Sequence, residues 1–90
     1  MNHAVRIRVR GWVQGVSFRV SAKEVAENLE ISGWVSNLDD GSVELHAEGE
    51  PSKLKMLIEW CWKGSPSAKV MDVELDWIPL QGLKGFQINY

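Results

Sequence analysis

Runs of alternating apolar and polar residues, interrupted twice by helical spacing, limit the fold of this chain more than any other feature. Val5, Ile7 and Val9 alternate with three arginines, which is the period of a half-buried strand. After Phe18 the apolar residues recur three or four positions apart, as in a helix with one buried face. In chain order, the expected elements are a strand ending at Gly11, a helix from about Phe18 to Leu29, strands at Ser32–Leu38 and Ser42–Glu48 joined by a turn at residues 39–41, a helix opened by Pro51 and closed by residues 64–66, a strand over residues 71–77 and a short strand over residues 86–90.

The order of these elements, βαββαβ followed by a short strand, predicts an α+β fold of the ferredoxin-like sandwich type. Two helices then cover one face of an antiparallel sheet, and the first strand lies between the third and the fourth. A length of 90 residues fits a single domain over residues 1–90 and leaves no room for a second core.

Three arginines of the first strand, Arg6, Arg8 and Arg10, are expected on the face of the sheet that points away from the helices. The neighbouring strands place acidic residues on both sides of this stripe: Glu44, Glu48, Asp72, Glu74 and Asp76. We therefore expect ion pairs between strands. The alternative is a stripe that binds phosphate or RNA.

Composition excludes several classes of function. The net charge of −2 gives no general attraction to nucleic acid or to anionic lipid, so any anion site is expected to be local. The single Cys61 cannot form an intrachain disulfide, and no Cys/His spacing is of the zinc type. No apolar run has the length of a secretory signal or a membrane span. The expectations are a cytoplasmic monomer with no metal, no other cofactor, and no membrane or nucleic-acid partner.

The segment GWVQGVSFR, residues 11–19, lies between the first strand and the first helix. A glycine-containing turn that enters a helix points several N–H groups at one spot, where the helix dipole also attracts an anion. Gly15 permits positive φ and close approach of a phosphate, and Arg19 offers a planar fork of donors. The alternative is an ordinary turn with a solvent-facing arginine. The Gly-Lys-Ser/Thr ending of a nucleotide P-loop is missing, so ATP or GTP chemistry is not indicated.

Together with GWVSNLDDGSVE at residues 33–44, this segment resembles the acylphosphatase family, whose pattern is G-x-V-Q-G-V-x-F-R followed by G-W-V-x-N-x-x-D-G-x-V-E. The match continues through Gly49, GSPSAKV and GFQINY. The resemblance implies hydrolysis of the carboxyl–phosphate bond of acyl phosphates without a metal, with Arg19 binding the phosphate and Asn37 positioning the attacking water. The backbone amides that are implied to cradle the phosphate belong to Gln14, Gly15, Val16, Ser17, Phe18 and Arg19.

The chemistry of an acyl phosphate agrees with this assignment. The leaving carboxylate has a conjugate acid with a pKa of about 4, so no general acid is needed. Asn37 can hold a water without repelling a phosphate dianion as a carboxylate would. If Val35 packs beneath the helices, Asn37 shares its strand face and points toward the loop. The alternative for Asn37 is a residue that only satisfies a turn.

Three positions differ from common family usage. Ser36 removes a positive charge beside the site. Trp12 is expected to cover the end of the strand, with contact to the acyl group of the substrate as the alternative. Glu30 replaces a glycine, and if its backbone is left-handed it lowers the stability of the fold by roughly 1 kcal/mol relative to glycine. Ser17 is not assigned as a nucleophile, because no base is placed to activate it.

Two other functions remain as alternatives. An RNA-binding domain of this topology stacks bases on aromatic residues of its sheet, but the predicted strand SVELHAEG has no aromatic residue and mostly acidic outward positions. Trp60 and Trp62 are instead expected to pack at the margin of the core. The second alternative is a non-catalytic domain that senses phosphate with the same loop.

Overall fold

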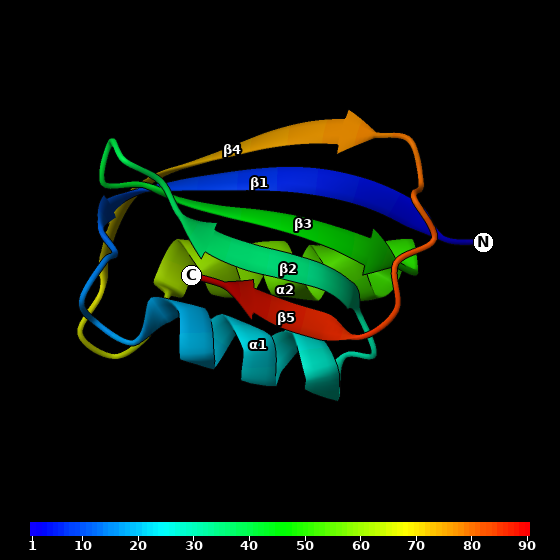
Figure 1. Ribbon diagram of the computed structural model, residues 1–90, viewed down its shortest axis with the longest axis horizontal. Helices are drawn as coiled ribbons and strands as arrows, with labels where there is room; N and C mark the ends of the chain where they lie inside the picture. Colours follow the sequence, from blue (N-terminus) through cyan, green and yellow to red (C-terminus); the bar gives the residue numbers. More distant parts are fainter.

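The predicted order of helices and strands is present in the computed structural model, which describes residues 1–90. The strands are β1 (His3–Trp12), β2 (Ser32–Asn37), β3 (Val43–Gly49), β4 (Lys69–Ile78) and β5 (Phe86–Asn89), and the helices are α1 (Phe18–Asn28) and α2 (Pro51–Lys63). The strands form one sheet in the order β4-β1-β3-β2-β5, with both helices on one face (Figure 1). The prediction of a ferredoxin-like sandwich, with β1 between β3 and β4, is confirmed.

The last strand departs from the predicted antiparallel sheet. β5 pairs with β2 in parallel, from Gly33 opposite Phe86 to Ser36 opposite Asn89, whereas the other pairs are antiparallel. After β4 at one edge, residues 79–85 cross the end of the sheet to the opposite edge, so β5 begins at the same end as β2 (Figure 1). The prediction of a purely antiparallel sheet is wrong at this pair, because an alternating run carries no information on strand direction.

The core lies between the helices and the sheet face that they cover. Val5, Ile7 and Val9 of β1 are fully buried there, in a cluster of 17 buried residues drawn from both helices and all five strands. Burying a side chain of this size contributes roughly 1.5–3 kcal/mol each. The residues with strand and helical periods in the sequence are thus the ones that face this core.

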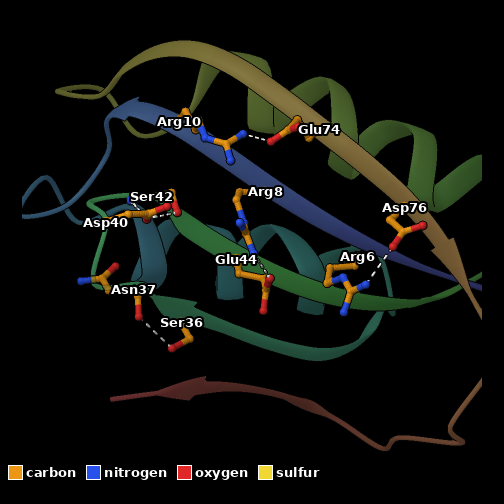
Figure 2. A network of polar contacts seen from close by, with 10 residues as sticks. All are labelled: Arg6, Arg8, Arg10, Ser36, Asn37, Asp40, Ser42, Glu44, Glu74 and Asp76. Atoms are coloured by element: carbon orange, nitrogen blue, oxygen red, sulfur yellow. Dashed lines mark hydrogen bonds and ion pairs between the residues drawn. The ribbon is translucent and has the colours of Figure 1, made fainter.

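The opposite face of the sheet carries the three arginines, each in an ion pair (Figure 2). Arg6 binds Asp76 at 2.8 Å and Arg8 binds Glu44 at 2.9 Å. Arg10 pairs with Glu74. The expected ion pairing between strands is confirmed, and it occupies the arginines that a phosphate- or RNA-binding stripe would need.

Glu48 was expected beside these arginines, and this expectation is wrong. Its carboxylate is buried at the other end of β3 and accepts hydrogen bonds from the amides of Gln81, Gly82 and Leu83 at 2.7–3.0 Å. His46, which is also buried, lies 2.9 Å from the same carboxylate and stacks on Trp34. The segment that crosses from β4 to β5 therefore binds the outward side of β3, which alternation alone had predicted to be exposed.

Candidate active site

The loop between β1 and α1 turns through two residues with left-handed backbone, Gly15 at φ 74° and Ser17 at φ 62°. A left-handed conformation costs a non-glycine residue roughly 1–2 kcal/mol, so Ser17 is strained. The amides of residues 14–20 donate no hydrogen bond within the protein, because they belong to the loop and to the first turn of α1. A row of N–H groups at the positive end of a helix dipole is thus available to an anion.

Side-chain hydrogen bonds from Gln14 and Ser65 hold this loop to other parts of the chain. The amide Nε2 of Gln14 donates to the carbonyl oxygens of Leu38 and Ser42, at 2.8 and 2.9 Å, which fixes the loop to the turn between β2 and β3. The hydroxyl of buried Ser65 donates to the carbonyl oxygen of Val16 at 2.7 Å. Sequence reasoning missed both contacts, since Ser65 stood out only as part of the GSPSAKV match.

Arg19 lies in the first turn of α1 and belongs to none of the protein's ion pairs. Its guanidinium carbon lies 4.9 Å from the centre of the Tyr90 ring, which is the geometry of a cation–π contact. A planar cation that rests on a ring but has no carboxylate partner keeps its N–H donors for another anion. No pattern in the sequence indicated that Tyr90 would lie beside Arg19.

Asn37 ends β2 on the helix-covered side of the sheet, two residues after the fully buried Val35. This agrees with the orientation expected from their shared strand face. The side-chain oxygen Oδ1 of Asn37 is buried and accepts no hydrogen bond from the protein. Neighbouring Ser36 donates only to the backbone oxygen of Asn37, at 3.2 Å (Figure 2). A buried polar atom without a partner is uncommon and often marks a ligand or water position.

One hollow of about 360 Å³ brings these groups together. It is lined by Val13, Gly15, Ser17, Phe18, Arg19, Val20, Asn37 and Tyr90. Five of the seven residues predicted for the site line it, whereas Gln14 and Val16 face the contacts that hold the loop. The arrangement can bind a small tetrahedral anion between a cation, free amides and an uncharged polar side chain.

The pocket contains no histidine or carboxylate side chain. His46 is bound to Glu48 at the opposite end of the sheet, and His3 lies at the start of β1. No three His, Cys, Asp or Glu side chains are grouped to hold a metal ion. None of the helices combines the length and the apolar character needed to cross a bilayer.

The departures noted in the sequence have mixed outcomes. Glu30 is left-handed at φ 58°, as its place after α1 suggested. Trp12 is 71% exposed, so the expectation that it covers the strand end is wrong. Trp60 packs on Phe18 with ring centres 5.0 Å apart, as expected for the margin of the core, whereas Trp62 projects into solvent.

Comparison with known proteins gives a consistent result. The model of the family described as Acylphosphatase matches residues 5–88. The acylphosphatase of Anaeromyxobacter sp. is 51% identical over 71 residues, which are 79% of this chain and 76% of the relative. That of Pseudomonas aeruginosa is 49% identical over 81 residues, which are 90% and 89% of the two chains. The crystal structure of acylphosphatase from Bacillus subtilis superposes with a TM-score of 0.95 at 41% identity over 100% of both chains.

Proposed function

The chain belongs to the acylphosphatase family, and from that premise we propose that the hollow between the 14–19 loop and Asn37 is its active site. An acylphosphatase hydrolyses the carboxyl–phosphate anhydride bond of acyl phosphates to a carboxylate and inorganic phosphate. One observation carries the assignment of the site: unpaired Arg19, the free loop amides and the unpaired Oδ1 of Asn37 share a single hollow.

The loop and Arg19 bind the phosphoryl group in this proposal. The amides of Gln14, Gly15, Val16, Ser17, Phe18 and Arg19 surround its oxygens, and the guanidinium binds two of them. Because the phosphoryl oxygens carry most of the charge in the transition state, donors fixed in advance stabilise that state without rearranging. The stacking of Arg19 on Tyr90 supports a guanidinium held in one orientation.

Asn37 positions the water. Its uncharged amide holds a water in line with the bond to the leaving carboxylate, which departs without protonation because its conjugate acid has a pKa of about 4. A phosphoryl oxygen of the substrate accepts the proton of the water, so no protein base takes part. The pocket lining, which contains neither a histidine nor a carboxylate side chain, supports this route.

Substituting Asn37→Ala tests the site. We expect turnover of benzoyl phosphate to fall by roughly 10²- to 10³-fold, as for the loss of one transition-state donor. Full activity in this variant would refute the role of Asn37. Wild-type protein that binds phosphate but does not hydrolyse benzoyl phosphate would instead favour the non-catalytic sensor.

The wild-type reaction itself has two further expected properties. Activity should persist in EDTA, because Arg19 and the amides supply the positive charge that a metal would otherwise provide. Alkyl phosphate esters should be nearly inert, because their alkoxide leaving groups need a proton or a metal. Loss of activity in EDTA, or equal rates on esters and acyl phosphates, would contradict this mechanism.

We also propose a cytoplasmic monomer with no nucleic-acid or membrane partner. Burial raises the pKa of the single cysteine, Cys61, to about 12, so its thiol is protonated and unreactive, as suits a protein without disulfides. The paired arginines leave no free basic stripe for nucleic acid. Sedimentation of the purified protein and fractionation of cells measure these two properties.

A further inference from the structure

A second hollow of about 750 Å³ lies beside the same loop, where β1 ends and β4 begins. Its lining includes Trp12, Val13, Gln14, Gly41 and Met71. Trp12 is 71% exposed and Met71 is 81% exposed, which is unusual for side chains of this size and polarity. Neither side chain contributes to the core or to the ion-paired stripe.

An irregularity in the sheet produces this surface. Arg10 pairs with Asp72 and the next residue, Gly11, pairs with Val70, so Met71 is an extra residue in β4. A β-bulge of this kind redirects side chains and is frequent next to active sites. Val70 packs on the core, while the bulged Met71 and the terminal Trp12 both line the hollow.

The hollow adjoins the proposed active site. Val13 lines both cavities, and the consecutive residues Gln14 and Gly15 line one each. Successive Cα atoms are about 3.8 Å apart, so the wall between the cavities is a segment of loop only a few residues long. A ligand with a phosphate in the smaller cavity can therefore extend an acyl group toward the larger one.

We propose that the hollow at Trp12 and Met71 binds the acyl group of the substrate and favours aromatic and bulky aliphatic acyl groups over acetyl. The inference rests on the proposed function, because it places the phosphoryl group with Arg19 and Asn37. An acyl phosphate has one charged end and one end that is often apolar, and the larger cavity is the more apolar of the two, with Lys69 as its one charged lining residue. Trp12 offers a flat apolar surface for an aromatic ring.

The test compares benzoyl phosphate with acetyl phosphate in Trp12→Ala and Met71→Ala. We expect each variant to lower the ratio of kcat/KM for benzoyl over acetyl phosphate by roughly tenfold, the lower end of the range for apolar contacts in a pocket. Inhibition by inorganic phosphate should not change, because the loop amides and Arg19 are untouched. Trp77→Ala, which removes another exposed tryptophan at the far end of β4, is the matched control.

Two results would overturn the inference. The first is an unchanged ratio in both variants, which would leave the apolar surface to another occupant such as a second protein. The second is an equal loss on both substrates together with weaker phosphate inhibition, which would make Trp12 a support for the loop. Wild-type protein that hydrolyses neither substrate would instead refute the proposed function, and the inference with it.

Discussion

At one end of the sheet the amides of Gln81, Gly82 and Leu83 converge on the carboxylate of Glu48, whereas at the other end the amides of residues 14–20 donate to no group of the protein. Both regions are loops that bring successive N–H groups together. The first encloses an anion that the chain itself supplies, and the imidazole of His46 is buried beside it. The second has an unpaired arginine and no carboxylate side chain in its lining.

This difference separates a structural use of backbone amides from a binding use. Where the anion belongs to the chain, the hydrogen bonds stabilise the fold and fix the route from β4 to β5. Where the anion must come from solution, we propose that the same kind of donor stabilises a substrate and its transition state. Variants at the two ends should therefore separate stability from activity.

The largest expected effect is the loss of activity in Arg19→Ala. Turnover of benzoyl phosphate should fall by roughly 10²- to 10³-fold or more, because a charged donor to the phosphoryl oxygens is removed. The free energy of unfolding, measured in urea, should change little, since Arg19 has no ion pair. Arg6→Ala removes an arginine that is bound to Asp76 and should keep full activity. Comparable turnover in the two variants would contradict the proposal that unpaired Arg19, unlike ion-paired Arg6, binds the substrate.

Glu48→Gln should show the opposite behaviour. We expect a loss of roughly 2–3 kcal/mol in the free energy of unfolding, because hydrogen bonds to a buried charge contribute more than neutral ones. Turnover well below the melting temperature should stay within about threefold of wild type. Asp76→Asn breaks an exposed ion pair and should cost at most about 1 kcal/mol. Equal losses of unfolding free energy in both variants would show that the buried carboxylate of Glu48 contributes no more to stability than an exposed ion pair.

Glu48→Gln should also change how the stability of the fold depends on pH in the acidic range. Burial alone would raise the pKa of Glu48, but hydrogen bonds from His46 and from the amides of Gln81 and Leu83 outweigh it and hold the pKa below its usual 4.5. A lowered pKa in the folded state stabilises the fold above pH 4.5, and this contribution is lost as the pH falls from 4.5 through the lowered value. The free energy of unfolding, measured in urea, should therefore fall less steeply between neutral pH and pH 3 in Glu48→Gln than in the wild type. An unchanged slope would contradict the role of the carboxylate.

The smallest effect is expected for Ser65→Ala. Its hydroxyl holds the carbonyl of Val16, so its loss should let the loop amides move and weaken competitive inhibition by inorganic phosphate by roughly fivefold, the value of about one hydrogen bond. Val73→Ala, a substitution in the core portion of β4, serves as a control for general destabilisation. Equal inhibition constants in both variants would mean that Ser65 contributes only to stability.

The sequence predicted the end of the sheet with the 14–19 loop better than the end where residues 79–85 enclose Glu48. Gly15 and Arg19 follow a strand and enter a helix, so local reasoning placed them together, and the shared strand face of Val35 and Asn37 placed Asn37 near them. The end around Glu48 depends on residues 79–85, which have no periodic pattern and cross from one edge of the sheet to the other. Alternation predicted Glu48 and His46 to be exposed, because it reports which face a residue takes and not what covers that face.

Contacts between distant parts of the chain were also missed at the site itself. Tyr90 reaches Arg19 because β5 runs parallel to β2, and strand direction at the end of the chain has no signature in a short alternating run. Ser65 reaches Val16 across 49 positions, and nothing in the local sequence indicates which carbonyl its hydroxyl will bind. The bulge at Met71 likewise depends on how β4 pairs with β1. Such contacts are properties of the packed chain.

The exposed indole of Trp12 can also serve as an intrinsic fluorescent probe. Trp12 stands in water beside the loop, whereas Trp60 is packed on Phe18 and Trp34 on His46. Emission from an indole shifts to shorter wavelength and changes in intensity when solvent leaves it. A chain that retained Trp12 as its only tryptophan would report occupancy of the proposed acyl hollow, and one that retained only Trp60 would report melting of the interior.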